Sequence, residues 1–256
     1  RILSQSYAFI KQEILQNRGT ERIFDLIQVR RSAAMLDMVQ VLEEKAWASP
    51  SSSSDTVLPY GVPYWIVKNA TTGFTGGAPS GHSTVGGLDP ATNTTWKNYA
   101  GLYTTVNKAD LVKKMRNMHF YTGFQSPVDV KDYTSGKGQQ YRVYCNRATT
   151  ADLEDIGESQ NENLGRDIAS IDGFSLTFRR NPIRTIQILD TDTSNPVYFL
   201  DHSTFYPVCL KGDYFRETVR KMASNQHDIT EVFIDLSYNY LCVDRRRNGV
   251  LATNAN

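Results

Sequence analysis

The sequence predicts a mixed α+β fold, and three observations carry that prediction. Apolar residues recur at intervals of three and four through the first quarter of the 256-residue chain, which is the spacing of amphipathic helices. A segment rich in glycine, threonine, serine and asparagine then interrupts the pattern. Short runs of β-branched and aromatic residues follow and gather late in the chain. Helices early and strands late are typical of the α+β class.

Two helices are expected in the first quarter. The first should cover residues 4–17 and end at Gly19, because glycine terminates helices at little cost. Thr20 is a good N-cap for a second helix over about 21–47, whose apolar positions fall on one face. Both helices together predict an N-terminal helical arm over 1–49.

The helical pattern ends at a flexible stretch. Pro50 and four serines interrupt it, and a strand-like run follows at 62–67. Residues 69–95 hold six glycines and almost no apolar side chains. Ordering such a segment costs about 1–2 kcal/mol per residue, which its own burial does not offset. We therefore expect this segment, like the arm, to be buried against another chain.

The remaining elements are shorter and mostly strands. The pattern predicts helices at 109–121 and 149–157, a third at 213–222, and strands at 141–144, 183–189, 196–200, 205–209 and 229–243.

Charge and hydropathy exclude two classes of protein. The chain carries 28 Lys and Arg against 27 Asp and Glu, whereas proteins that hold nucleic acid tightly are usually strongly basic. This balance permits self-association. No apolar run approaches the roughly 18 residues that a membrane span needs.

We find no pattern that predicts catalysis, a metal site or a cofactor. The three cysteines are odd in number and widely spaced, and the four histidines lack metal-ligand spacing. His202 and Cys209 could form a Cys–His pair, but a polar residue beside a strand turn explains His202 more simply. Asp190 and Asp192 likewise indicate a turn rather than a cation site.

One glycine-rich stretch imitates a phosphate-binding loop. Residues 76–83 approach the pattern G-x-x-x-x-G-K-[ST]. However, His82 stands where the lysine is required, and Gly86, Gly87 and Pro90 follow where a helix must begin. A glycine-rich loop is the better interpretation.

Several phrases resemble the major capsid proteins of tailed double-stranded DNA bacteriophages, which have the Hong Kong 97-type fold. The resemblance runs over about 20–250 and lies in the order of elements more than in any single motif. The phrases are Pro59 to Asn69, Gly87-Leu88-Asp89, Trp96 to Ala100, Val106 to Leu111, Gln160 to Gly165 and Phe178 to Ile183.

The resemblance implies a domain plan. The arm at 1–49 would lie on a neighbouring subunit, and the extended loop at 50–106 would cross an adjacent one. Residues 107–139 and 226–256 would form the peripheral domain, with the helix at 109–121 as a short spine helix. Residues 140–225 would form the axial domain.

The resemblance also implies a function. The chain would be a structural protein and not an enzyme, assembling in the host bacterial cytoplasm into hexamers and pentamers of an icosahedral head shell in the virion. Its partners would be other copies, scaffold, portal and decoration proteins, and packaged double-stranded DNA held by weak non-specific contact, with no membrane. The first residue is Arg1 rather than methionine, as expected if an upstream segment has been removed.

Two alternatives remain open at this point. One is an encapsulin-like bacterial nanocompartment shell protein, and the other is a hydrolase that uses Cys145 or Cys209.

Ten residues are candidates for contacts. Those expected between subunits are Tyr64, Trp65, Phe74, Trp96, Tyr99, Arg179 and Arg180. Those expected to touch DNA or a neighbour's carboxylates are Arg245, Arg246 and Arg247, unless this basic run is only a solvated surface patch.

Overall fold

The computed structural model describes residues 1–16, 20–123, 141–158, 176–179, 181–218, 221–222 and 228–255. The chain forms two compact units, which are treated separately below. The first comprises Arg1–Pro50, Ser54–Gly61 and Pro207–Tyr240, and the second comprises Ser51–Ser53, Val62–Tyr206 and Leu241–Asn256.

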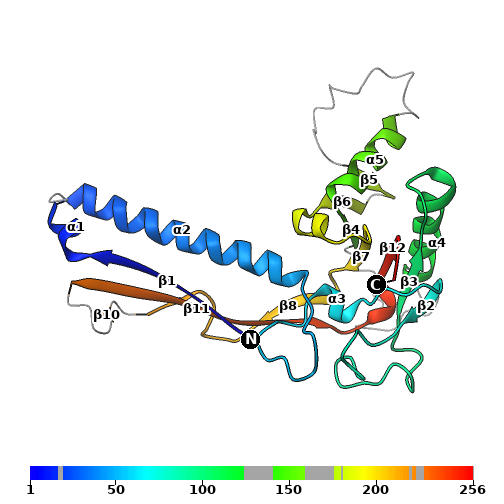
Figure 1. The fold of residues 1–256 in the computed structure, drawn as a ribbon, viewed down its shortest axis with the longest axis horizontal. Coiled ribbons are helices and arrows are strands. Elements are labelled where there is room, and N and C mark those ends of the chain that lie inside the picture. Colours follow the sequence, from blue (N-terminus) through cyan, green and yellow to red (C-terminus); the bar gives the residue numbers. More distant parts are fainter. Residues whose placement is uncertain are drawn as a thin grey trace. The chain divides into compact units, whose positions relative to one another are not determined.

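The first unit consists of a long helix and an antiparallel sheet. Its elements are β1 (Ile2–Ile10), α1 (Lys11–Gln16), α2 (Thr20–Ala46), β9 (Arg216–Glu217), β10 (Lys221–Met222), the end of β8 (Phe205–Cys209) and most of β11 (Ile229–Cys242). All nine residues of β1 pair with β11, from Ile2 opposite Ser237 to Ile10 opposite Ile229. Figure 1 shows α2 running alongside these two strands.

The core of this unit lies between α2 and the sheet. Side chains alternate between the two faces of a strand, so Phe9 is buried while Ile10 is 42% exposed. Val232, Ile234 and Leu236 alternate in the same way on β11. The buried members of this cluster are Tyr7, Phe9, Ala34, Met38, Val232, Ile234, Leu236 and Tyr238.

The predicted helix at 4–17 is wrong for most of its length, so the range 1–49 is not helical throughout. Residues 2–10 are a strand because their partner is β11, more than 200 residues later in the sequence. The predicted helix at 21–47 is confirmed by α2. One face of α2 is buried on its own unit's sheet, not on a neighbouring chain.

The second unit is built on a seven-stranded mixed sheet. The strand order is β2-β3-β12-β7-β4-β6-β5. β12 pairs in parallel with β3 and antiparallel with β7, which places the C-terminal strand inside the sheet. The strands are β2 (Gly73–Gly76), β3 (Asn98–Leu102), β4 (Tyr141–Cys145), β5 (Thr177–Phe178), β6 (Asn181–Thr185), β7 (Val197–Asp201) and β12 (Gly249–Ala252).

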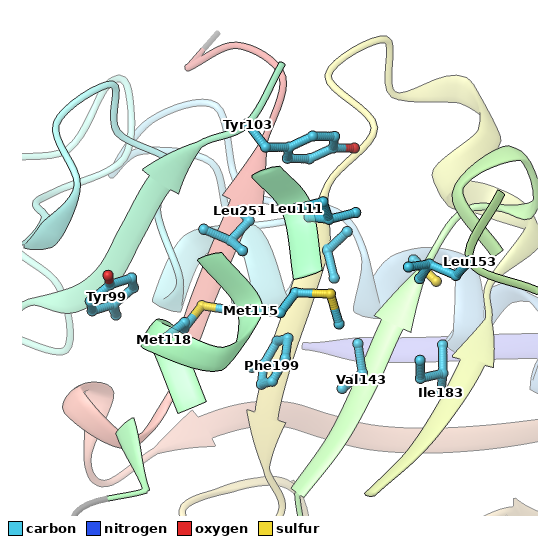
Figure 2. Packing of buried hydrophobic residues seen from close by; sticks show 12 residues of the cluster. Tyr99, Tyr103, Leu111, Met115, Met118, Val143, Leu153, Ile183, Phe199 and Leu251 are labelled. Atoms are coloured by element: carbon cyan, nitrogen blue, oxygen red, sulfur yellow. The ribbon is translucent and has the colours of Figure 1, made fainter. Parts of the chain in front are cut away.

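Helices α4 (Lys113–Thr122) and α5 (Arg147–Glu158) pack on this sheet, together with a π-helical turn at Lys108–Val112 that continues into α4. The unit also contains α3 (Val62–Trp65) and 3₁₀ turns at Gln187–Thr191 and Arg245–Arg247. Figure 2 shows Met115 of α4 above Phe199 and Val143 of the sheet, with Leu153 of α5 farther along the same face. Burial of this cluster supplies the hydrophobic stabilisation of the unit.

Several sequence predictions need correction in this unit and beside it. The run at 62–67 is not a strand but begins with α3. In place of a helix at 213–222, the described residues of that range contain the short strands β9 and β10. The predicted strands at 141–144, 196–200, 205–209 and 229–243 are confirmed.

The compact units do not follow the predicted domain boundaries. Helix α4, which was predicted in the peripheral domain, packs on strands β4 and β7, which were predicted in the axial domain. Residues 107–123 and 141–206 therefore lie in one unit. Residues 207–225 belong instead to the range of the first unit. The phrase at 160–165 and the whole of 124–139 lie outside the described residues. Among the described helices, none has the length and apolar character of a membrane span.

Candidate functional site

The glycine-rich segment is organised by a buried arginine. The side chain of Arg245 is fully buried. Its Nε donates to the carbonyl oxygen of Trp65 at 2.6 Å and its Nη1 to that of Trp96 at 2.8 Å. Its Nη2 donates to the carbonyl oxygens of Gly77 at 2.8 Å and Gly76 at 3.3 Å. The guanidinium therefore ties together three stretches of backbone far apart in sequence.

Asn98 completes this arrangement, which we name the arginine clamp (Trp65, Gly76, Gly77, Trp96, Asn98 and Arg245). The Asn98 Oδ1 accepts from Arg245 Nη2 at 3.0 Å and from the Val67 backbone N–H at 3.0 Å. Gly76 approaches so closely that a Cβ there would lie 2.1 Å from this oxygen. A glycine is needed at 76 because any larger residue would displace the amide.

The arginine clamp contains no carboxylate. Among the described residues, every hydrogen-bond partner of the Arg245 guanidinium is a carbonyl or amide oxygen. Burial lowers the pKa of Arg245 to about 10, so the side chain stays protonated at neutral pH. A buried cation held only by dipoles fixes the loop geometry strictly, because each bond depends on the position of one backbone group.

The arginine clamp corrects two expectations. Arg245 is not part of a surface basic patch, and its burial leaves no side-chain surface for DNA or a neighbouring chain. The segment at 69–95 is not ordered only by a partner, because its backbone carbonyls at 76 and 77 bind Arg245 of the same unit. Tyr64, Trp65 and Tyr99 are buried in the same unit, which removes most of their surface for contacts between subunits.

A second cluster of predicted residues lies at the surface of the second unit. The rings of Phe74 and Tyr99 meet edge to face at 5.6 Å, and Tyr121 stacks on Tyr99 at 5.7 Å. The guanidinium carbon of Arg246 lies 4.3 Å from the centroid of the Phe74 ring. Tyr121 is 60% exposed, so this cluster reaches solvent.

Arg179 makes a similar contact on the neighbouring side chain of α4. Its guanidinium carbon lies 4.3 Å from the centroid of the Phe120 ring, and Phe120 is 65% exposed. Arg179 has a φ of 50°, a left-handed conformation that non-glycine residues rarely adopt. Burial, followed by the charge of Arg179, lowers the pKa of His119, which keeps that imidazole neutral at pH 7. We name Phe74, Phe120, Tyr121, Arg179 and Arg246 the cation–aromatic surface.

The charges around this surface are unpaired. Lys113 and Arg116 lie on the exposed side of α4. Arg116 follows Lys113 by three residues and precedes Phe120 by four. Neither forms an ion pair with any of the residues that the structure describes. On α5, Asp152, Glu154 and Asp155 are exposed and equally without an ion pair among those residues.

The first unit also exposes apolar side chains. Val29, Leu36 and Val39 of α2 are 65%, 71% and 53% exposed. Leu36 and Val29 lie on the side of the helix opposite the buried Met38, and Val39 lies between these two sides. Exposed apolar side chains of this kind are typical of surfaces that bind a partner.

The two buried cysteines, Cys145 and Cys242, are poorly suited to act as nucleophiles. Burial raises the pKa of the Cys145 thiol to about 11 and that of Cys242 to about 12. His202 Nε2 hydrogen-bonds the hydroxyl of Tyr144 at 2.7 Å. Asp192, one of the two carboxylates predicted to lie in a turn, forms an ion pair with Lys68 at 2.6 Å. Within the described ranges, no group of three metal-ligating side chains occurs.

The thiols give a direct test of this burial. We expect Cys209, which is exposed, to react rapidly with a disulfide reagent at pH 8, and Cys145 and Cys242 to react only after unfolding, because the thiolate is the reactive form. The number of cysteine thiols that react with the reagent before and after addition of denaturant measures this difference. Rapid reaction of two or three thiols in the folded protein would contradict the structure.

Not every predicted contact residue belongs to the cation–aromatic surface. Phe74, Arg179 and Arg246 are members of this surface, and the buried ring of Tyr99 packs against Phe74. Trp96 donates its indole N–H to the carbonyl oxygen of Val85 at 2.9 Å and serves the glycine-rich segment. Arg247 pairs with the buried Asp201 at 3.5 Å, and Arg180 lies outside the described residues.

Sequence reasoning missed Phe120 and Tyr121. A signal was available, because Met115 and Met118 define the buried side of α4 and place Phe120 and Lys113 on the opposite side. The pairing of Arg179 with Phe120 had no local signal, since it depends on the fold.

Comparison with known proteins identifies the fold. No family model matches the chain, and no curated protein matches it by sequence. Among solved structures, it is similar to the cyanophage A-1(L) capsid, with a TM-score of 0.57 and 11% identity over 100% of this chain and 77% of that one. The capsid of a native GTA particle gives a TM-score of 0.60 and 12% identity over 100% of this chain and 73% of that one.

A bacterial compartment protein matches as well. The SrpI encapsulin of Synechococcus elongatus PCC 7942 gives a TM-score of 0.53 and 11% identity, over 100% of this chain and 74% of that one. Because these matches extend over the whole chain, residues 1–256 have the Hong Kong 97-type capsid fold.

Proposed function

We propose that the chain is a structural capsid protein that assembles into hexamers and pentamers and so forms the icosahedral head shell around phage double-stranded DNA. The observation that carries this proposal is the similarity in fold to phage capsids over 100% of the chain.

Exposed apolar surface supports self-association. Val29, Leu36 and Val39 on α2, and Phe120 and Tyr121 on α4, are more than half exposed in the isolated chain. Such surface is typical of proteins that bury it against a partner. In a shell, many weak contacts of this kind add up, because each copy is held by several neighbours at once.

The two units suggest a revised domain plan for this proposal. We assign the first unit to the peripheral domain, with the 27-residue α2 as its spine helix in place of the shorter α4. We assign the second unit, with its mixed sheet, to the axial domain.

The partners follow from the same proposal. Other copies of the chain are the main partner, and scaffold, portal and decoration proteins would act during assembly of a phage head in the bacterial cytoplasm. Contact with packaged DNA would be weak, because the net charge of the chain is only +1. Arg246 is the one member of the predicted basic run that is well exposed for such contact.

A second candidate function is the shell of an encapsulin-like bacterial compartment. The match to the SrpI encapsulin covers this chain as completely as the phage matches do. The two functions differ in content: a compartment encloses a cargo protein, whereas a phage head encloses DNA.

Sedimentation and negative-stain microscopy of the purified protein test the proposal. We expect closed particles in which nearly all of the protein sediments far ahead of a monomer. Particles that co-purify with one cargo protein would favour the compartment. A monomer that persists at high concentration, with or without scaffold, would overturn both.

A further inference from the structure

We infer that the cation–aromatic surface of one copy docks on the acidic side of α5 in a second copy, as a head-to-tail contact between second units. This inference rests on the proposed shell function and names the surfaces that would meet within a ring of subunits.

The first partner in this contact is basic and aromatic. Lys113, Arg116 and Phe120 follow one another along the exposed side of α4 at spacings of three and four. Arg179 covers Phe120 with its guanidinium at 4.3 Å, and Arg246 covers Phe74 at the same distance. Exposed aromatic rings combined with arginine are the composition of energetic centres in protein interfaces.

The second partner is the acidic side of α5. Asp152 and Asp155 are three residues apart and share one side of the helix, whereas Glu154 projects from a different side. All three are exposed, whereas Leu153 between them is buried on the sheet. Carboxylates without a cation on a short helix repel one another, and a cationic surface relieves this repulsion.

The complementary charges lie on one unit but do not pair there. Among the described residues, neither the cations Lys113, Arg116 and Arg179 nor the three carboxylates form ion pairs in the isolated chain. Two unlike surfaces on the same unit produce a head-to-tail contact, and repeated contacts of this type close into rings. In a closed ring, one neighbouring copy therefore covers the basic surface and the other neighbouring copy covers the acidic side. Nucleic acid would satisfy only the basic one.

Paired charge reversals test this contact. We expect Arg116→Glu with Arg179→Glu, and separately Asp152→Lys with Asp155→Lys, each to raise the protein concentration needed for assembly at least tenfold, because like charges then face each other. All four substitutions in one chain should restore assembly to within about threefold of the natural sequence, because the complementarity is restored with its sign exchanged.

A matched control separates this effect from net charge. Lys11→Glu with Lys211→Glu changes the net charge as the first pair does, at exposed positions of the first unit, and should leave assembly unchanged. Thermal unfolding of dissociated subunits shows whether each variant is still folded.

The outcomes distinguish this inference from the proposed function. If the natural sequence forms particles and both reversed pairs assemble equally well, the contact is wrong while the shell function stands. If only the basic reversal impairs assembly, the partner is another acidic molecule such as DNA, and the inference is overturned. If the natural sequence forms no particles, the shell function itself is wrong.

Discussion

Replacing Arg245 by methionine should lower the free energy of unfolding by about 4 kcal/mol or more, because several buried oxygens lose their donor and each unsatisfied group costs about 1–3 kcal/mol. These are the carbonyl oxygens of Trp65, Trp96 and Gly77, whereas the Oδ1 of Asn98 keeps the Val67 backbone N–H as a donor. Methionine fills similar space but donates no hydrogen bond. Chemical denaturation of dissociated subunits, followed by tryptophan fluorescence, measures the loss.

The neighbouring arginine provides the matched control. Arg246→Met removes an exposed guanidinium from the same tripeptide and should change stability by less than about 1 kcal/mol. Arg245→Met and Asn98→Ala should also be strongly non-additive, since both remove the same hydrogen bond. Equal effects of the Arg245 and Arg246 substitutions would contradict the arginine clamp.

Replacing Phe9 by alanine is expected to destabilise the first unit by about 3–5 kcal/mol, the usual cost of a buried phenylalanine. Phe9 is 2% exposed and belongs to the cluster formed by α2 and β11. The loss should appear as a lower transition midpoint in denaturant, with the helix signal of α2 lost in the same transition.

Ile10→Ala is the control for this substitution, because Ile10 lies next in the strand and is 42% exposed. We expect its cost to stay below about 1 kcal/mol. Similar effects at both positions would therefore contradict the pairing of β1 with β11.

The elements that the sequence predicted well are those with strong local signals. The helix at 21–47 has apolar residues at helical spacing behind a good N-cap, and α2 begins and ends within one residue of that range. The strands at 141–144 and 229–243 alternate between apolar and polar residues, and the structure has them as β4 and β11.

The elements that were predicted wrongly depend on partners far away in the chain. Residues 2–10 carry little local preference, and their pairing with β11 decides the structure. The glycine-rich segment has no apolar pattern because its order comes from hydrogen bonds to Arg245, about 170 residues later. A buried arginine cannot be told from an exposed one when it stands in a run of three.

The candidate surfaces were predicted in part for the same reason. Phe74, Arg179 and Arg246 were singled out as contact residues by type, and the structure places each against an aromatic ring. The acidic side of α5 was not predicted as a surface. Its role depends on a second copy, which no single sequence describes.

A cryo-EM reconstruction of the assembled protein tests the central claim most directly. We predict a closed icosahedral shell in which each copy keeps the arginine clamp and in which α5 of one copy faces α4 of the next. A protein that stays monomeric under all assembly conditions, or that forms particles without pentamers and hexamers, would contradict the account.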